Sequence, residues 1–576
     1  MAPSKRTWHQ AAGGAEDLQL TPAEREERAK AADAAYARLD EEAARFEAEG
    51  LERFTVGGDP ESPHMIVIGG GLVGALCATD LLAKGFKVTL YERYQDIRSI
   101  PQLGRSINLS VTSRGLRAIK SLGGTLYDDV LKIARPVTGR IIHLADGQTL
   151  FQRYGKDDTE YNYAISRFEL NKLLLEKAAE AGADLHFNYV LSETSDFGGD
   201  EAVGCTLNFT REDPNAPGKK QCIQVNAACP VIACDGAGSR IRYAMRHAGL
   251  TNFEEDLLTQ GYKEVLFPNP GENDFGAPGS DGGEACPGIR GLHIWPRGNH
   301  FLMALPNIDG SFTGTIYMEM KGDNDSFASL SDRAACADFC EKHYGAAAPL
   351  VGGLDSMVSQ VSGNPVGLLG TVRCDTWAAR GRVILIGDSS HAMVPFFGQG
   401  CNCGFEDVSW LSRFLDEHCG EGGKIVPAKC TAANYEACFA ALEAERKPNA
   451  NAICDMALEN MAEMGSKTAD TKFRAMKKVE NKLENNFGSK FRSRYAMVCY
   501  GGDGNVSYAN AKSLGVVQQQ ILEKLCEDMA PEKLADEEGT AAEVEKVDMD
   551  RALALIDELL RPAQEALKID LTAVKY

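Results

Sequence analysis

Long apolar segments and internal repeats are missing from this chain of 576 residues. No uninterrupted apolar run reaches the ~20 residues that a membrane-spanning helix needs. No signal peptide is recognised, and no unit of about 20–50 residues recurs. We therefore predict no transmembrane segment. Because 44% of the residues are hydrophobic, a chain of this length can form two or three globular domains.

Positive charge is scarce, with 61 Lys and Arg against 82 Asp and Glu and a net charge of −21. This balance argues against nucleic acid or an anionic membrane surface as the main partner. The 17 cysteines show no regular spacing, which predicts free thiols in a reducing compartment. No Cys/His grouping has the spacing of a zinc site, so we predict no metal. The predicted location is cytoplasmic or otherwise soluble.

What the chain does contain is a glycine cluster between two apolar segments at 65–92. The order is a short branched strand, the turn G-x-G-x-x-G, a helical stretch and a second strand that ends in an acid. The glycines are Gly69, Gly71 and Gly74, and the acid is Glu92. This order predicts a dinucleotide-binding βαβ unit in which the acid binds a ribose. An acid at this position favours FAD or NAD over NADP.

Further along the chain, two more buried strands end in turn residues, at Asp235-Gly236 and Gly387-Asp388. Four β-strands are predicted without helices between them, at 262–267, 293–296, 301–305 and 312–318. Such strands suggest an antiparallel sheet that forms the floor of a site. Strands at 135–144 and 149–154 are predicted to form a hairpin.

Together and in this order, the three strand ends resemble the FAD-binding motifs of class A flavoprotein monooxygenases. Longer motifs narrow the resemblance to the kynurenine 3-monooxygenase family and cover roughly residues 64–500. These motifs are VIGGGLVG at 67–74, GRSINL at 104–109, LHIWPR at 292–297 and VPFFGQG at 394–400. The chain departs from the family in having Ser389-Ser390, Cys401 and Cys403. Its C-terminus is acidic and amphipathic, whereas eukaryotic members usually end in a membrane-anchoring helix; mitochondrial association is therefore only an alternative location.

The resemblance implies an α/β fold with a Rossmann-like FAD-binding domain, an inserted, mainly antiparallel β-sheet substrate domain and a helical C-terminal region. The predicted divisions are an N-terminal helical extension at 1–60, a discontinuous FAD-binding domain, a substrate domain, a helical region at 426–530 that closes the site, and an acidic linker with a terminal helix at 531–576. The FAD-binding domain comprises 64–135, 155–250 and 370–425, and the substrate domain comprises 136–154 and 255–369.

The resemblance also implies which residues bind FAD. They are Gly69, Gly71, Leu72, Val73, Gly74, Glu92, Arg93, Ser110, Arg167, Leu191, Asp235, Gly387, Asp388, Gly400, Cys401 and Asn402. The turn at 398–400 precedes a predicted helix, whose N-terminus would stabilise negative charge on the flavin. NADPH is the implied transient co-substrate. The residues themselves do not decide whether the enzyme uses NADPH or NADH.

For the substrate, the resemblance implies a carboxylate site at Arg140 and Tyr154, with Asn460 and Tyr495 as further contacts and Phe396 and Phe397 beside the aromatic ring. Arginine suits a carboxylate because its guanidinium binds both oxygens. No catalytic acid or base is assigned.

The implied reaction belongs to tryptophan degradation: L-kynurenine + NADPH + O2 + H+ gives 3-hydroxy-L-kynurenine + NADP+ + H2O through a C4a-hydroperoxyflavin. Two alternatives remain open. One is a class A hydroxylase of another aromatic acid or amine, and the other is a non-catalytic flavin-binding interaction protein. The oligomeric state is left open.

Overall fold

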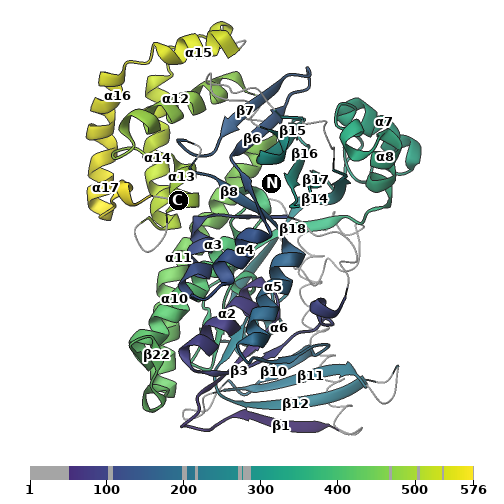
Figure 1. The fold of residues 1–576 in the computed structure, drawn as a ribbon, viewed down its shortest axis with the longest axis vertical. Coiled ribbons are helices and arrows are strands. Elements are labelled where there is room, and N and C mark those ends of the chain that lie inside the picture. The colour runs from purple at the N-terminus through teal and green to yellow at the C-terminus, as the bar shows by residue number, and fades with distance from the viewer. Residues whose placement is uncertain are drawn as a thin grey trace.

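The computed structural model describes residues 51–100, 108–157, 159–197, 204–213, 218, 220–269, 275–276, 287–465, 470–501, 506–534 and 537–574. The helix predicted in the N-terminal extension and residues 104–107 of the GRSINL motif lie outside this part. Two large sheets follow one another along the long axis, and the C-terminal helices run along one side (Figure 1).

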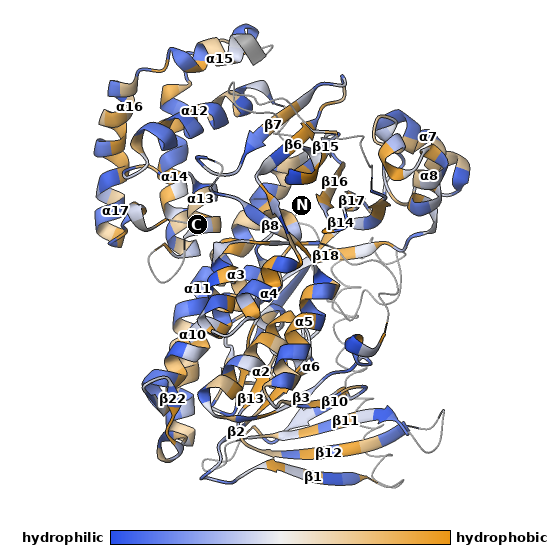
Figure 2. Ribbon diagram, viewed as in Figure 1, coloured by the Kyte–Doolittle hydropathy of each residue, from blue (hydrophilic) through white to orange (hydrophobic). Residues whose placement is uncertain are grey.

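A six-stranded sheet with the order β19-β20-β13-β2-β3-β9 lies below the second sheet in Figure 1. It is parallel except for the edge strand β19. The strands are β2 (His64–Ile68), β3 (Lys87–Tyr91), β9 (Asp184–His186), β13 (Val231–Ala233), β19 (Ala378–Ala379) and β20 (Val383–Leu385). Its inner strands are apolar without alternation because both faces are covered, and β13 and α2 (Leu72–Lys84) are largely hydrophobic in Figure 2. The predicted strand–turn–helix–strand unit is confirmed.

The second large sheet has seven strands in the order β18-β14-β17-β16-β15-β6-β7. They are β6 (Gly139–His143), β7 (Thr149–Arg153), β14 (Phe253–Phe267), β15 (Gly291–Pro296), β16 (Phe301–Pro306), β17 (Phe312–Glu319) and β18 (Gly367–Cys374). All neighbours are antiparallel except β6 and β15. The predicted antiparallel sheet and the predicted hairpin are confirmed. Residues 370–374, assigned from the sequence to the FAD-binding domain, form part of β18 in this sheet.

Side chains of this sheet alternate between its two faces. Leu302, Ala304 and Ile316 join a separate apolar core beneath α7 (Arg333–Tyr344) and α8 (Leu354–Gly363). Met303 and Tyr317, which lie next to them in sequence, line the large cavity on the other side. The sheet therefore forms the floor of that cavity and carries its own helical layer behind it.

Two smaller sheets complete the strands. β4 (Asn108–Val111), β8 (Asn162–Ser166) and β5 (Ala134–Val137) form a three-stranded sheet. β1 (Glu52–Gly57), β10 (Val190–Ser195), β11 (Thr206–Glu212) and β12 (Lys220–Ala228) form a four-stranded one. The assignment of residues 51–60 to a helical extension is wrong, because β1 pairs in parallel with β12. Its alternating sequence, Arg-Phe-Thr-Val, suits an edge strand.

Helices cover the six-stranded sheet and lead to the C-terminus. The first group is α3 (Ser113–Ser121), α4 (Leu126–Lys132), α5 (Arg167–Glu180), α6 (Arg240–His247), α9 (Asp388–His391) and α10 (Gly400–Cys419). The C-terminal group is α11 (Ala432–Gly465), α12 (Thr471–Phe487), α13 (Arg494–Tyr500), α14 (Tyr508–Leu525), α15 (Glu537–Glu545), α16 (Met549–Leu555), a π-helical turn (Ile556–Leu560) and α17 (Arg561–Leu567).

The acidic linker predicted at 532–547 is also corrected, since part of it forms the helix α15, which contacts α12. Val544 is buried in that contact. The high acid content hid this helix because its apolar residues are few. Among the described residues, no helix combines the length and the apolarity required to cross a bilayer.

Candidate functional site

A cavity of about 800 Å³ lies between the two large sheets. Segments distant in sequence border it: the turn after β2, the turn before α10, the hairpin β6–β7 and the start of α13. Most predicted site residues line this one cavity. They are Gly69, Gly71, Leu72, Val73, Glu92, Arg93, Ser110, Arg140, Tyr154, Arg167, Leu191, Asp235, Asp388, Phe396, Phe397, Gly400, Cys401 and Tyr495. Gly74, Gly387, Asn402 and Asn460 are not among its lining residues and lie behind it.

The glycine turn after β2 fits a dinucleotide. Gly69 has φ +103°, and an added Cβ there would collide with the carbonyl of Cys234. A Cβ at Gly74 would collide with the carbonyl of Gly69, so this glycine lets α2 pack against the strand. A Cβ at Gly71 would meet no atom within 4 Å. Gly71 thus leaves backbone open to the cavity, as a pyrophosphate requires.

Glu92 is held at the end of β3 beside this turn. Its Oε2 accepts a hydrogen bond of 2.6 Å from the amide of Gly70, and its Oε1 accepts one of 2.9 Å from the amide of Tyr94. These two bonds fix the carboxylate at the rim of the cavity. A carboxylate in this position can accept hydrogen bonds from ribose hydroxyls.

The other end of the cavity is formed by α9 and α10. Asp388 is exposed although the residues that follow it are buried, and it lines the cavity. The 20-residue helix α10 begins at Gly400 with no acid in its first turn. Its N-terminus therefore presents unopposed positive charge to the cavity, suited to an anionic group. Burial raises the pKa of Cys401 to about 12, so this thiol stays protonated.

Asn402 fixes the position of that N-terminus. Its Nδ2 donates to the carbonyl of Ser110 at 2.8 Å and to that of Gly398 at 2.9 Å, and its Oδ1 accepts from the amide of Thr112 at 2.9 Å. Its side chain is fully buried and committed to these bonds. Asn402 therefore ties α10 to β4, and only its backbone is left for a ligand.

Arg140 is buried at the opposite side of the cavity, on β6. Its Cζ lies 5.9 Å from the ring centre of Tyr154 and 5.8 Å from that of Tyr495, and these two rings stack with centres 4.8 Å apart. Burial alone would lower the pKa of Arg140, but the Glu463 carboxylate and the two phenols together outweigh burial and raise the pKa above its usual range. The guanidinium is a permanent cation framed by two phenols.

Both phenols keep their protons, since burial raises the pKa of Tyr154 and of Tyr495 above the usual value. The Tyr495 oxygen accepts a hydrogen bond of 2.8 Å from Nδ2 of the buried Asn162. Tyr495 is the acceptor in that bond, so its own hydroxyl proton is donated elsewhere. Arg140 and the two tyrosines can together donate several hydrogen bonds to one anion.

The apolar side of the cavity is built around Phe396. Its ring meets the ring of Tyr317 edge-on, with ring centres 5.0 Å apart, and its centre lies 5.8 Å from that of Phe301. The ring of Phe397 stacks on that of Tyr495, with centres 5.7 Å apart. Asn460 donates a bond of 2.6 Å to the carbonyl of Phe396. The predicted contact of Asn460 with substrate stays a prediction; the bond shown holds the aromatic turn in place.

Known proteins resemble this chain in sequence. A family model described as "FAD binding domain" matches residues 63–280 and 369–425. The chain is 38% identical over 462 residues to a kynurenine 3-monooxygenase of Stenotrophomonas maltophilia, which covers 80% of this chain and 92% of the relative. It is 36% identical over 497 residues to that of Myxococcus xanthus, covering 86% and 95%.

The chain belongs to the kynurenine 3-monooxygenase family. It is an FAD-dependent monooxygenase, and FAD is its cofactor. Solved structures support the fold alone. The tetrameric form of 2-methyl-3-hydroxypyridine-5-carboxylic acid oxygenase has a TM-score of 0.51 and 18% identity, covering 70% of this chain and 93% of that one. The p-nitrophenol 4-monooxygenase of Pseudomonas putida has a TM-score of 0.51 and 17% identity, covering 76% and 94%.

In this family member, the sequence did not identify Glu463, which lies on α11 with Asn460. Its Oε1 accepts a hydrogen bond of 3.0 Å from Arg140. Burial would raise the pKa of Glu463, but Lys477 and Arg140 hold it below the usual value. Spacing offered a signal, because Glu463 follows Asn460 by three residues and shares its helix face.

A buried ionic network behind α9 was also missed. Asp407 accepts from Nε2 of His391 at 2.6 Å, from the amide of Gly387 at 2.9 Å and from Nε of Arg446 at 2.8 Å. All three side chains in the network, His391, Asp407 and Arg446, are at most 2% exposed. They hold the Gly387–Asp388 turn from behind. No local pattern predicted this network, because Arg446 lies 39 residues from Asp407.

Proposed function

We propose that the protein hydroxylates L-kynurenine to 3-hydroxy-L-kynurenine, with NADPH and O2 as co-substrates and FAD as the bound cofactor. The observation that carries the proposal is the buried Arg140, framed by Tyr154 and Tyr495, on the wall of the same cavity that contains the glycine turn. Relatives of this chain are kynurenine 3-monooxygenases. An amino acid with an aromatic ring matches a cavity that is cationic at one side and aromatic at another.

Arg140 is proposed to bind the substrate carboxylate. One of its nitrogens, Nη1, is bonded to Glu463, and Nε is buried without a hydrogen-bond partner. A carboxylate beside the guanidinium would supply a partner, which favours binding because an unpaired buried donor is costly. Tyr154 and Tyr495 would donate from their hydroxyls to the same carboxylate.

Phe396, Phe397 and Tyr317 are proposed to orient the aromatic ring. Aromatic contacts of this kind are worth about 0.5–1.5 kcal/mol beyond the area they bury. With the carboxylate fixed at Arg140, these rings would limit the substrate to one direction across the cavity. Orientation decides the position of hydroxylation, because the protein contributes placement rather than the oxidation itself.

The residues proposed to hold FAD are Gly69, Gly71, Glu92 and Asp388, together with the N-terminus of α10. Bound FAD supplies the chemistry, which is the transfer of one oxygen atom from O2 after reduction by NADPH. The chain's own part is to orient the substrate, to exclude water and to keep the thiol of Cys401 and the two phenols protonated.

The test compares Arg140→Ala with Arg153→Ala. Arg153 lies on the neighbouring strand β7 and is not a lining residue of the cavity. Loss of charge-assisted hydrogen bonds of about 1.5–3 kcal/mol predicts that KM for L-kynurenine rises about 10- to 100-fold in Arg140→Ala. FAD content should stay unchanged in both variants, and KM should stay unchanged in Arg153→Ala.

The readouts are NADPH oxidation, oxygen uptake and 3-hydroxykynurenine formed, with other aromatic acids and amines as a substrate panel. An unchanged KM in Arg140→Ala would refute the carboxylate role. If the enzyme hydroxylates another compound in the panel faster than L-kynurenine, that compound is the better candidate for its substrate. Bound FAD without any substrate-stimulated NADPH oxidation would point to a non-catalytic flavoprotein.

A further inference from the structure

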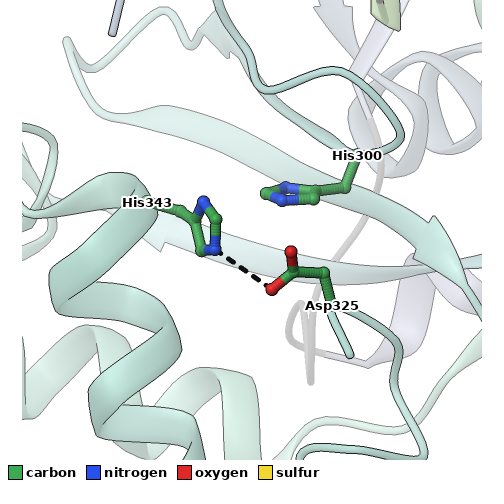
Figure 3. Close-up of side chains that lie close together, drawn as sticks. All are labelled: His300, Asp325 and His343. Carbon is green, nitrogen blue, oxygen red and sulfur yellow. Dashed lines mark hydrogen bonds and ion pairs between the residues drawn. The ribbon is translucent and has the colours of Figure 1, made fainter. Parts of the chain in front are cut away.

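We propose that His300, Asp325 and His343 form a binding site for a divalent transition-metal ion, with Zn²⁺ as the best match. One ligand atom from each residue lies within 4.8 Å of the other two. None of the three is among the residues that line the large cavity. Figure 3 shows the two imidazoles and the carboxylate gathered beside the end of a helix. We call these three residues the His300 cluster.

The cluster draws on three separate segments. His300 immediately precedes β16, Asp325 lies in the connection between β17 and α7, and His343 is in the last turn of α7. Asp325 has φ +47°, an uncommon conformation for a residue with a side chain. An ion held by all three would link α7 to the edge of the seven-stranded sheet. The separation of these residues in sequence explains why no zinc spacing was visible.

His300 has a nitrogen available for a metal. Its Nδ1 is hydrogen-bonded to the hydroxyl of Tyr344 at 2.7 Å, whereas its Nε2 is buried and has no hydrogen-bond partner. The residue is 1% exposed, so an unpaired ring nitrogen there is costly without a ligand. A hydrogen bond on the other ring nitrogen is the usual support of a metal-binding histidine, since it fixes the tautomer and the ring direction.

The other two residues complete the coordination set. Nε2 of His343 lies 3.1 Å from Oδ1 of Asp325. Two ligands of tetrahedral zinc, each about 2.0–2.2 Å from the ion, lie roughly 3.3 Å apart, so this pair is nearly at the required spacing. The side chains of His343 and Asp325 are 15% and 29% exposed. An ion can therefore enter from solvent, and water can take the fourth position.

The donor set selects the class of ion. Two imidazoles and one carboxylate suit Zn²⁺ and similar ions better than Ca²⁺ or Mg²⁺, which prefer oxygen. Arg297 and Lys342 also face the cluster and oppose a cation, although Arg297 donates to the carbonyls of His143, Pro296 and His343.

A second buried group, His391, Cys403 and Asp407, also brings potential ligands together. There the guanidinium of Arg446 already contacts the carboxylate of Asp407 at 2.8 Å and the Cys403 sulfur at 3.3 Å. A cation occupies that position, so a metal is excluded. In the described part of the chain, no Lys or Arg is bonded to the ligand atoms of the His300 cluster.

The experiment titrates Zn²⁺ into the full-length FAD-loaded enzyme after treatment with EDTA and dialysis, against a chromogenic chelator. Wild type should bind one equivalent, and His343→Ala and Asp325→Asn should each weaken that binding at least tenfold. His186→Ala is the matched control, because His186 is also bonded to an aspartate, Asp184, at 2.9 Å, but forms no cluster of three potential ligands with other described residues. It should bind Zn²⁺ as wild type does.

Co²⁺ provides an independent readout. Wild type loaded with Co²⁺ should show the intense visible absorption of a four-coordinate ion, and His343→Ala should lose it. Thermal unfolding without metal verifies that each variant is folded. Equal Zn²⁺ affinity in wild type and His343→Ala would overturn the proposal, as would an equal loss in His186→Ala.

Discussion

His391 and Asp407 form a buried ion pair behind the Gly387–Asp388 turn, and their pKa values move in opposite directions. Burial opposes the charge on His391, but Asp407 outweighs it and raises the pKa of His391 well above 6.5. Burial likewise opposes the charge on Asp407, and His391 and Arg446 hold its pKa below 3.8. The pair therefore stabilises the fold only in the range in which both groups are charged.

The expected pH dependence follows from these directions. The contribution of His391 is complete below pH 6.5 and is lost as pH rises toward its raised pKa, because the folded state then holds a proton that the unfolded state has released. That of Asp407 is present above pH 3.8 and is lost on acidification through its lowered pKa. Between pH 6.5 and 8.5, the free energy of unfolding of wild type should fall relative to that of His391→Gln, by up to about 1.4 kcal/mol per pH unit.

Urea midpoints at several pH values measure this difference. Parallel pH profiles for wild type and His391→Gln would show that His391 carries no charge in the folded protein. His186→Gln serves as the control, since His186 is partly exposed at its ion pair with Asp184, and its profile should follow that of wild type.

The sequence alone predicts some residues of the site but not others. The G-x-G-x-x-G turn, Glu92 and Asp388 were predictable, because each follows a buried strand in an order that defines the motif. Glu463, Asn162 and Arg446 were not, because their roles depend on partners far along the chain. Asn162, for example, bonds to Tyr495, 333 residues away. A local pattern carries no information on such pairs.

At the scale of elements, the turn between β2 and α2 contains two glycines that are needed for different reasons. Gly74 is needed for packing, since a Cβ would collide with the carbonyl of Gly69, whereas Gly71 borders open space. Gly71→Ala should therefore fold normally but bind FAD about 10- to 100-fold more weakly, if contacts with the pyrophosphate of about 1.5–3 kcal/mol are lost. Gly74→Ala should fail to fold stably.

Flavin fluorescence titration of the apoprotein and circular dichroism distinguish these outcomes. Wild-type FAD affinity in Gly71→Ala would contradict a cofactor at this turn, and a normally stable Gly74→Ala would contradict the close packing of α2 on the strand.

Elements were predicted where apolar periodicity is strong and missed where it is weak. Buried parallel strands and the sheet of β14–β17 have continuous or alternating apolar residues, and both were recognised. β1 was missed because it is a mostly exposed edge strand, and α15 was missed because acids dominate it. Both gain their structure from a neighbour, β12 in one case and α12 in the other.

At the scale of the whole molecule, α3 connects the FAD-binding part to the C-terminal helices. The side chain of Arg114 is buried, and it donates to the carbonyls of Val498 at 2.5 Å, Met497 at 3.0 Å and Val506 at 2.6 Å. It also pairs with Glu406 on α10 at 2.7 Å. Met497 and Val498 share the helix α13 with Tyr495, whereas Val506 precedes α14. This one side chain therefore links α10, which borders one end of the cavity, to the helix that carries Tyr495.

We therefore expect Arg114→Met to uncouple the two parts. Breaking a buried pair costs about 3–5 kcal/mol, and the carbonyls of α13 also lose their donor. Calorimetry should show a lower first transition for the C-terminal helices, separate from the release of FAD. KM for kynurenine should rise because Tyr495 is no longer held in position.

Arg117→Met is the matched control on the same helix, since Arg117 is only partly buried and bonds to the carbonyls of Tyr500 and Gly501. The effect of Arg117→Met on both readouts should be smaller. If Arg114→Met unfolds in one transition together with flavin release, at the temperature of wild type, α3 does not couple the two ends of the site.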